Sequence, residues 1–424
     1  MYPLIGLVLE TFPKSSEAFI LDEILELERQ GLDLHIFSLR QPLEQDTLVA
    51  HQVKAPITYV PSLLPKFDRE QEKQLINAQV ELFEQDSAVY LKTLKLYLNR
   101  HEDQKFNEFL QGGYLAWKLQ SLGITHLHAH FAGLPAATAE IAQAFSGASY
   151  SMTVHTQDIQ LNDQTALDRR ITKAEFVVTD SEHSRKHLKQ VSTSDTPIHM
   201  AYHGVDIDCF RPCPRTQQLD VPLILSTGHL CESSGFSYLL EACYLLQKKG
   251  IAFNCKIIGD GPSKESLQQQ IHDFELGEHV VLMGNLSQKQ LIDYYQQATL
   301  FVLPYLVNDN GERDGIPNAL LEAMAMELPV VTTDILGISE LMQPQYNGML
   351  VAEKDSLALA EALETLFMQP ELGRTLGKNS RVIVSDKFGL ISNMSLIKDS
   401  LLRATEQPMR LDSYVSKRVR ITAS

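Results

Sequence analysis

The feature that most constrains the fold is an alternation of apolar β-type runs with amphipathic helical runs, which recurs in both halves of the chain. Strands that alternate with helices form parallel sheets with helices on both faces. The pattern therefore predicts an α/β fold with two doubly wound, Rossmann-like parallel-sheet domains. The predicted strands are Leu4–Leu9, Leu34–Leu39, His126–Phe131, Ser149–His155, Phe176–Thr179 and Ile198–His203, followed by Leu223–Thr227, Asn254–Ile258, Val280–Met283, Leu300–Leu303, Pro329–Thr332 and Met349–Val351.

The runs between these strands carry apolar residues at helical spacing. Residues 64–123 are rich in Glu, Gln, Lys and Leu, and they predict a helical insertion in the first domain. The other predicted helices cover 17–31, 134–146, 182–190, 236–249, 263–273, 288–297, 317–327, 336–342, 356–368 and 371–384.

The segment HGVDIDCFRPCPRTQQLDVP at 203–222 has three prolines and no periodicity, which indicates a linker. We expect an N-terminal domain at 1–205, a C-terminal domain at 206–385, a helix at 386–405 that crosses back to the first domain, and a tail at 406–424. Open α/β sheets bind ligands at the carboxyl ends of their strands. We therefore expect a ligand cleft between the two domains.

Composition excludes several classes of protein. A net charge of −16 argues against a nucleic-acid partner, because phosphate neutralisation needs clustered Lys and Arg. The five cysteines form no C-x-x-C pair and predict free thiols in a reducing compartment. The apolar N-terminus is too short to span a membrane and has no basic flank. We therefore expect a cytoplasmic protein.

One amphipathic segment leaves a peripheral membrane contact open. The segment YLKTLKLYLNR at 90–100 carries Lys92, Lys95 and Arg100 among apolar residues. It is either a solvated helix face or a helix that lies against an anionic membrane.

The segment RDGIPNALLEAMAMELPVVTTD at 313–334 carries two acidic residues of interest. Pro317 suits the first turn of a helix. On that helix Glu322 has mostly apolar neighbours, so its semi-buried carboxylate needs a partner, either a backbone group or an Arg, unless it binds a ligand. Asp314 is either a helix cap or a second acceptor for sugar hydroxyls. The N–H groups of Gly315 and Ile316 can then bind a diphosphate between the two acids.

Histidines cluster at the ends of predicted strands. His126, His128 and His130 alternate and therefore point to one face of a strand. His130 ends that strand and His155 ends the next, and both are candidates for a site at the carboxyl ends, whereas His128 is interpreted as structural.

These segments resemble, in order, the motifs of the retaining glycosyltransferases of family four, which have the GT-B fold. Asp314-x7-Glu322 resembles the E-x7-E signature of the family, with Asp in place of the usual first Glu. The other matching pieces are SSEAFILDEILELERQG (15–31), THLHAHFA (125–132), YSMTVHTQDI (150–159), YHGVDIDCFRP (202–212), IIGDGP (257–262) and TTDILGISELM (332–342).

The resemblance implies transfer of a sugar from a nucleotide-diphosphate sugar to a saccharide or lipid-linked acceptor in polysaccharide biosynthesis, with retention and without a metal or other cofactor. It implies that Glu322 binds the donor ribose and that Asp314 contacts the transferred hexose. His130, His155 and Asp158 would lie near the reacting centre. The remaining donor-side residues that it implies are Gly228, His229, Ser234, Gly259, Gly261, Gly315, Ile316, Pro317 and Asn318; Ser16 and Glu17 are either a helix cap or acceptor-side residues.

The turn GHLCESSG at 228–235 departs from the family pattern G-R-L-x-x-x-K-G. His229 stands for the Arg and Ser234 for the Lys, two cations that would bind the diphosphate. Hydrogen bonds to charged groups are worth about 1.5–3 kcal/mol each, so the loss of both weakens the phosphate site substantially. Two hypotheses stay open: an active transferase with an atypical phosphate site, or a catalytically impaired relative that acts as a scaffold or nucleotide-sugar binder.

Overall fold

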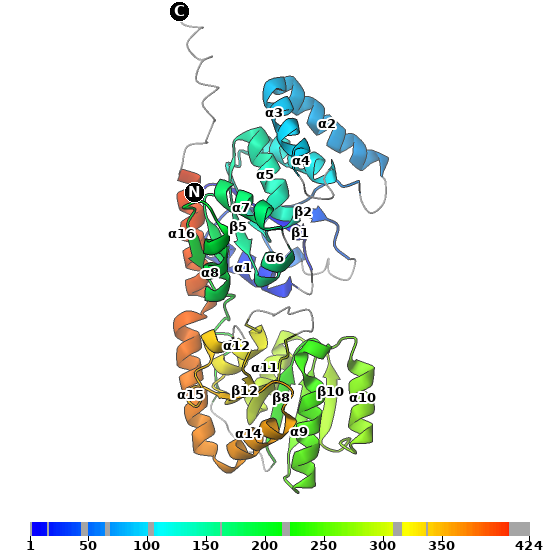
Figure 1. Cartoon of the computed structure of the whole chain (residues 1–424), viewed down its shortest axis with the longest axis vertical. Coiled ribbons are helices and arrows are strands. Elements are labelled where there is room, and N and C mark those ends of the chain that lie inside the picture. The colour runs from blue at the N-terminus through cyan, green and yellow to red at the C-terminus, as the bar shows by residue number, and fades with distance from the viewer. Residues whose placement is uncertain are drawn as a thin grey trace, which may run out of the picture. The chain divides into compact units, whose positions relative to one another are not determined.

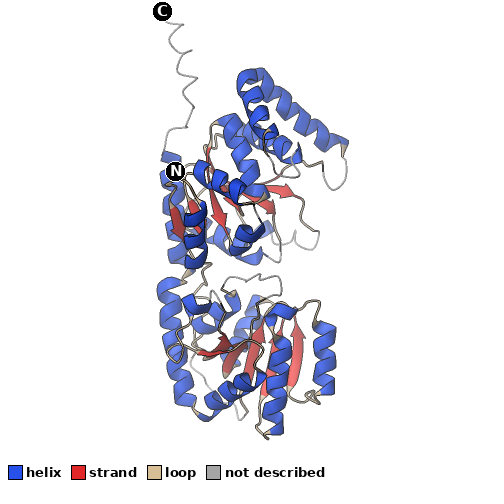
Figure 2. Cartoon of the chain, in the orientation of Figure 1, coloured by secondary structure: helices blue, strands red, loops and turns tan. Residues whose placement is uncertain are grey.

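The structure is a computed structural model that describes residues 2–14, 17–43, 50–63, 68–100, 106–161, 163–213, 221–307, 316–335 and 338–406. The chain divides into two compact units, one of Met1–Ala201 and Met394–Ser424 and the other of Tyr202–Asn393. Within each unit helices cover both faces of a parallel sheet (Figure 2). The predicted fold class is therefore confirmed.

The first unit contains a seven-stranded parallel sheet in the order β3-β2-β1-β4-β5-β6-β7. The strand order reverses between β1 and β4, which makes their carboxyl ends the switch point of the sheet. Strand β3 was not predicted, because three half-buried residues show no periodicity. The strands are β1 (Ile5–Thr11), β2 (Leu34–Arg40), β3 (Ile57–Tyr59), β4 (His126–His130), β5 (Ser149–Val154), β6 (Val177–Thr179) and β7 (Ile198–Met200).

The helices of this unit include the predicted helical segment and two short helices, α6 and α7, that were not predicted. Helices α2, α3 and α4 lie together beside α5 (Figure 1). Their buried residues, among them Leu75, Leu82, Phe109 and Leu115, belong to the main core of the unit, so this segment is an integral part of the core. The helices are α1 (Ala18–Arg29), α2 (Arg69–Gln85), α3 (Ser87–Leu98), α4 (Phe106–Leu122), α5 (Leu134–Ser146), α6 (Thr156–Leu161), α7 (Gln164–Lys173) and α8 (Glu182–Val191).

The second unit contains a six-stranded parallel sheet in the order β10-β9-β8-β11-β12-β13. Written from its first strand, this is the dinucleotide-binding order 3-2-1-4-5-6, with the switch point between β8 and β11. The strands are β8 (Leu223–Thr227), β9 (Asn254–Ile258), β10 (Val280–Gly284), β11 (Leu300–Leu303), β12 (Val330–Thr333) and β13 (Met349–Val351).

The helices around this second sheet follow the predicted pattern closely. Helix α12 begins at Asn318 rather than at Pro317, because Pro317 has extended backbone angles and occupies the N-cap position. Helix α16 (Leu390–Glu406) begins in the second unit and ends in the first. The other helices are α9 (Phe236–Lys248), α10 (Lys264–Asp273), α11 (Gln288–Gln297), α12 (Asn318–Ala325), α13 (Ile338–Leu341), α14 (Ser356–Met368) and α15 (Pro370–Lys387).

Two further expectations can be compared with the structure. All five cysteines are free thiols, as predicted. Among the helices of the described ranges, none has the length and apolar content that a membrane span requires.

Gly235, which ends the turn after β8, is required by its backbone geometry. It has φ +66°, and a Cβ atom there would lie 1.8 Å from the carbonyl oxygen of Pro304. Gly250 has φ +73° as well, but nothing lies within 4 Å of its Cβ position. Both glycines have a backbone conformation that strains other residues, but only at Gly235 would a side chain also overlap a neighbouring atom.

We expect Gly235→Ala to lower the free energy of unfolding by about 2–4 kcal/mol, because the left-handed conformation and the overlap both oppose a side chain. Gly250→Ala, which carries only the conformational strain, should cost about 1 kcal/mol. Urea unfolding followed by circular dichroism measures both. Equal losses would show that the contact with Pro304 relaxes at no cost.

Candidate functional site

The carboxyl ends of β4 and β5 bring three predicted site residues together in the first unit. His130 ends β4, is buried, and places Nε2 3.6 Å from Oε2 of Glu23 on α1. The ring of His155, which follows β5, stacks on the His130 ring with 6.5 Å between centroids. Asp158 on α6 accepts a hydrogen bond from the backbone N–H of His155 at 3.0 Å.

Acidic side chains surround both histidines. Nδ1 of His155 lies 3.2 Å from Oδ2 of Asp180, the residue that follows β6. Burial raises the pKa of the Asp158 carboxyl, although its contacts with His155 oppose that shift. Imidazoles held beside carboxylates at strand ends can bind hydroxyl groups and transfer protons, so this cluster suits an alcohol substrate.

Phe131, directly after His130, is strained and was not predicted as part of this cluster. It has φ +78°, a conformation that a bulky side chain rarely adopts. Its ring contacts the His155 ring at 4.7 Å between centroids. Such outliers concentrate at functional sites, where the surrounding structure holds them in place.

The other two histidines of β4 form a buried ladder with hydroxyl groups of β5. His126 contacts Ser149 and Ser151 at 2.8 Å each, and His128 contacts Ser151 at 2.8 Å and Thr153 at 3.0 Å. Burial lowers the pKa of His126 to about 3 and that of His128 well below the usual value. Both rings are therefore neutral and serve the fold, as expected for His128.

In the second unit, the GHLCESSG turn consists of a loop and a 3-10 turn at Glu232–Ser234, and it ends at Gly235, the N-cap residue of α9. The N–H of Gly228 donates to the Ile258 carbonyl, and the N–H of Leu230 donates to the Asp260 carbonyl. The predicted Gly259 has φ +141°, and a Cβ atom there would lie 1.9 Å from the carbonyl oxygen of Gly228. The turns after β8 and β9 are therefore tightly joined, which accounts for the glycine at 259.

Two polar side chains near this turn, Ser234 and Lys264, are engaged within the protein. His229 is exposed, whereas Ser234 is fully buried and its hydroxyl donates to the His229 carbonyl at 2.6 Å. Lys264, at the start of α10, contacts Asp260 at 3.0 Å. This ammonium group, followed by the N–H of Gly261, lowers the pKa of Asp260. The Ser234 hydroxyl and the Lys264 charge are thus both engaged within the protein.

Glu322 lies on α12 and has a partner that the sequence did not suggest. The hydroxyl of Tyr295 on α11 lies 2.9 Å from its Oε2. The tyrosine is fully buried and its neighbour Tyr294 is not. A buried tyrosine needs a partner for its hydroxyl, but nothing in the sequence indicates which one.

The remaining predicted residues are placed only in part. Ser16, Asp314 and Gly315 lie outside the described residues. Glu17 occupies the N-cap position of α1 without a capping hydrogen bond, and its carboxylate pairs with Lys14. Ile316 and Pro317 are half-buried at the start of α12, and Asn318 is exposed there.

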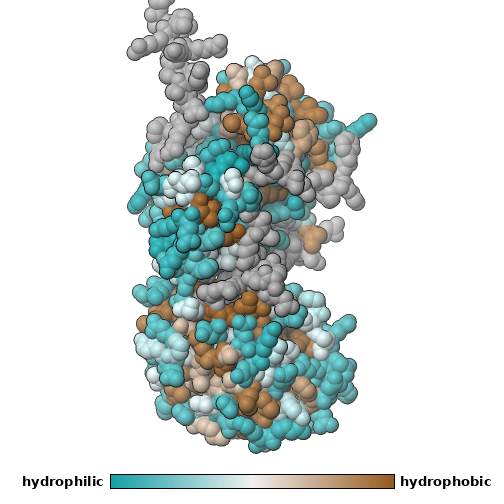
Figure 3. Space-filling model, viewed as in Figure 1, coloured by the Kyte–Doolittle hydropathy of each residue, from teal (hydrophilic) through white to brown (hydrophobic). Residues whose placement is uncertain are grey.

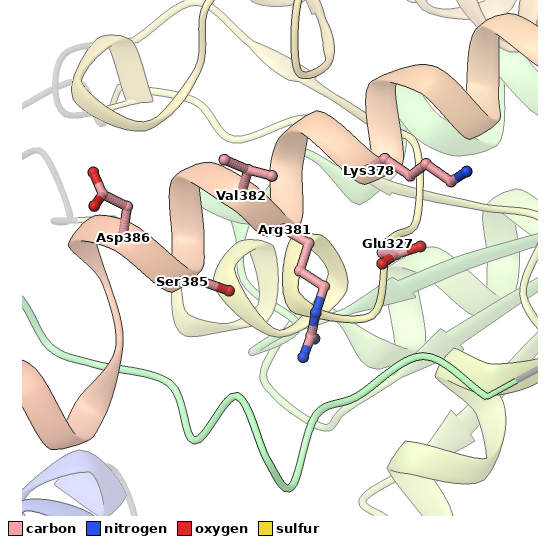
Figure 4. A pocket seen from close by; sticks show the side chains of 6 residues that line it. All are labelled: Glu327, Lys378, Arg381, Val382, Ser385 and Asp386. Carbon is pink, nitrogen blue, oxygen red and sulfur yellow. The ribbon is translucent and has the colours of Figure 1, made fainter.

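A shallow surface pocket along α15 is a separate feature. Arg381 extends from α15 toward the linker, away from Val382 and Asp386 (Figure 4). Its guanidinium donates to the carbonyls of Ile207 at 3.2 Å and Phe210 at 3.0 Å, and also to that of Ala325. The pocket therefore has a structural arginine, and none of the predicted donor residues lines it.

Comparisons with known proteins agree with this architecture. The family model "Glycosyl transferases group 1" matches residues 215–382. The chain is 26% identical over 378 residues to the putative colanic acid biosynthesis glycosyltransferase WcaL of Escherichia coli (strain K12), covering 85% of this chain and 89% of that protein. It is 40% identical over 140 residues to the amylovoran biosynthesis glycosyltransferase AmsK of Erwinia amylovora, covering 33% of this chain and 34% of that protein.

The fold is shared with solved structures of low sequence identity. The crystal structure of Anabaena Alr3699/HepE in complex with UDP matches with a TM-score of 0.70 at 16% identity, covering 94% of this chain and 99% of that chain. The architecture is therefore GT-B. Residues 215–382 therefore form a domain of the glycosyl transferases group 1 family.

The neutral, buried His126 predicts a pH dependence of stability. Its pKa is about 3 in the folded protein, against an ordinary value of 6.5. Between these values the unfolded chain binds a proton that the folded protein does not, so stability rises with pH by about 1.4 kcal/mol per unit. This contribution is present above pH 6.5 and is lost as the pH falls toward 3.

When the pH falls from 7.5 to 5, we expect the buried His126 to lower the free energy of unfolding by about 2 kcal/mol. Replacement by Gln removes the titrating ring, so His126→Gln should reduce the pH dependence by that amount even if it is less stable at every pH. Urea unfolding at both pH values measures the difference, with the exposed His51→Gln as the matched control. An unchanged slope in His126→Gln would contradict a neutral ring.

Proposed function

We propose that the chain is a retaining glycosyltransferase that moves a sugar from a nucleoside-diphosphate sugar to a saccharide or lipid-linked acceptor in polysaccharide biosynthesis. One observation carries the proposal. The second unit has a dinucleotide-binding strand order, and the turns after β8 and β9 follow the carboxyl ends of its strands, while Glu322 lies on α12, the next helix after β11. The similarity to WcaL, a putative colanic acid biosynthesis glycosyltransferase, and to the amylovoran biosynthesis glycosyltransferase AmsK supports the reaction class and the pathway.

The chemistry of the donor favours these positions. A carboxylate such as Glu322 accepts hydrogen bonds from the two ribose hydroxyls. During transfer, the bond between the anomeric carbon and the diphosphate oxygen breaks, and a bond to the acceptor oxygen forms on the same face of the sugar. The acceptor proton leaves, and negative charge develops on the diphosphate. Donors fixed around that charge are what accelerate such a reaction.

The acceptor hydroxyl fits the residues of the first unit. His130, His155 and Asp158 lie at the carboxyl ends of β4 and β5, where polar groups can bind and orient an alcohol. We assign these three residues to the neighbourhood of the reacting centre, and Ser16 and Glu17 to the acceptor side. Uridine is the base that we propose for the donor, because HepE was solved with UDP.

A catalytically impaired nucleotide-sugar binder or scaffold is the second candidate function. The turn 228–235 contains neither Lys nor Arg, and the nearby Lys264 is paired with Asp260. His229 is then the side chain of the turn whose ring N–H can donate a hydrogen bond to a diphosphate. We therefore propose an atypical phosphate site whose strength depends on this histidine.

We expect the protein to bind UDP weakly and His229→Arg to tighten that binding about tenfold, since one hydrogen bond between charged groups is added. Isothermal titration calorimetry measures both dissociation constants. The exposed His272→Arg on α10 makes the same change of charge elsewhere in the unit and should leave the affinity unchanged.

Two outcomes decide between the candidate functions. Absence of binding to any of the common nucleoside diphosphates at millimolar concentration would overturn both the transferase and the nucleotide-sugar binder. Binding without turnover of nucleotide sugars in the natural protein, with turnover in His229→Arg, would favour the impaired protein.

We also propose that an exposed surface of α2 and α3 contacts an anionic membrane. Six large apolar side chains on these helices are 45–68% exposed: Ile76, Val80, Phe83, Leu91, Leu96 and Leu98. Hydrophobic surface is visible over these two helices in Figure 3. Helix α3 adds the exposed Lys92 and Lys95 and no acidic residue, in a chain whose net charge is −16. Acidic residues on α2 make α3 the centre of this contact.

The cations of α3 predict a preference for anionic lipid. We expect the protein to float with vesicles of phosphatidylglycerol and phosphatidylcholine, and less with phosphatidylcholine alone. Each surface cation contributes about 1 kcal/mol, so Lys92→Glu with Lys95→Glu should lower the partition coefficient at least tenfold. Lys186→Glu with Lys189→Glu on α8 is the matched control. An equal loss of vesicle binding in both pairs of substitutions would contradict a contact through α3. A self-associated protein in which these apolar residues are buried between copies would contradict it as well.

A further inference from the structure

Tyr295 is a buried polar side chain of the second unit that contacts Glu322, the residue proposed to bind the ribose. Its exposed fraction is 0%. Its hydroxyl lies 2.9 Å from Oε2 of Glu322, 3.3 Å from the carbonyl oxygen of Ala319 and 3.4 Å from Oγ1 of Thr227. The shortest of these contacts is the one to the carboxylate.

The chemistry of the hydroxyl determines the direction of this hydrogen bond. Burial, and then the nearby Glu322, raise the pKa of Tyr295 well above its ordinary value, so the phenol stays protonated. A phenol has one proton to donate, and a carboxylate is a stronger acceptor than a carbonyl. Tyr295 therefore donates to Glu322, and the hydroxyl of Thr227 can donate to the phenol oxygen.

The position of the phenol is fixed by packing. The Tyr295 ring contacts Phe301 on β11 at 5.8 Å and Phe210 of the linker at 6.0 Å, between centroids. Phe210 is in turn held by the hydrogen bond that its carbonyl accepts from Arg381. A tyrosine that is wedged between aromatic rings cannot follow a mobile carboxylate, so the carboxylate takes the orientation that the phenol sets.

We propose that Tyr295 is a positioning residue for donor recognition: its hydroxyl holds Oε2 of Glu322 and fixes the carboxylate for the ribose hydroxyls of the nucleotide. This proposal rests on the proposed function, because it takes Glu322 as the ribose ligand. Glutamate has several rotatable bonds, and a carboxylate that is ordered before binding loses less freedom when the nucleotide arrives.

The test separates the ribose from the rest of the nucleotide. We expect Tyr295→Phe to weaken UDP binding about tenfold, the size of one hydrogen bond to a charged group. Binding of 2′,3′-dideoxy-UDP, which lacks both ribose hydroxyls, should be the same in Tyr295→Phe and in the natural protein. Tyr294→Phe removes a phenol hydroxyl from the preceding residue of α11 and should leave both affinities unchanged. Calorimetry measures all of these constants.

A double-mutant cycle tests whether the effect passes through the carboxylate. Tyr295→Phe should add little to the loss of UDP affinity caused by Glu322→Gln, because the two residues then act as one unit. Additive losses would overturn the proposal, and so would equal losses of UDP and 2′,3′-dideoxy-UDP in Tyr295→Phe, since both would indicate general support of the fold. An unchanged affinity for UDP in Tyr295→Phe would overturn it as well.

A protein that binds no UDP would contradict the proposed function but would leave the contact itself to be tested. In the ligand-free protein, loss of the phenol should loosen the first half of α12, where Ala319 and Glu322 lie. Amide hydrogen exchange of the peptide over 318–325 should then be faster in Tyr295→Phe than in Tyr294→Phe. Equal exchange in the two variants would overturn a positioning role.

Discussion

Burial of parallel strands on both faces is the constraint on which the other features depend. A strand inside such a sheet exposes neither face to water, so a polar side chain within it must find a partner in the sheet. His126 and His128 meet this requirement through hydroxyls of β5 and stay neutral. Only at the strand ends do polar residues become available for ligands, and there His130 and His155 contact carboxylates. Three alternating histidines on one strand therefore divide into two structural residues and one candidate site residue.

Close packing of backbone is the corresponding constraint at the turn 228–235 of the second unit. The turns after β8 and β9 approach so closely that Gly259 has no room for a side chain beside Gly228. Among the described residues beside this contact, His229 and Lys264 of α10 have basic side chains that lie outside it. Lys264 of α10 neutralises Asp260, so it adds little net positive charge. The turn therefore keeps a backbone in which β8, β9 and α9 meet closely, while few basic side chains accompany it.

The fold was predictable because its signal is periodic and repeated. Most strand boundaries agree within two residues, and β8, β9, β11 and β13 agree at both ends. The contacts between elements were less predictable. Ligands bind at the carboxyl ends of parallel strands, and Asp180 follows the end of β6 as His155 follows the end of β5. Asp180 could therefore have been predicted as a site residue. Tyr295 could not, because its partner depends on how α11 packs against α12, and no local pattern encodes that packing.

The linker shows how the core and the candidate site of the second unit form one structure. Arg381 draws the carbonyls of Ile207 and Phe210 toward the end of α12, where the carbonyl of Ala325 is its third acceptor. A cation at the carboxyl end of a helix is favourable for the helix dipole as well. The ring of Phe210 then packs against Tyr295, whose hydroxyl reaches Glu322. Because each contact fixes the next, a substitution at Phe210 should affect the Glu322 carboxylate through the ring of Tyr295.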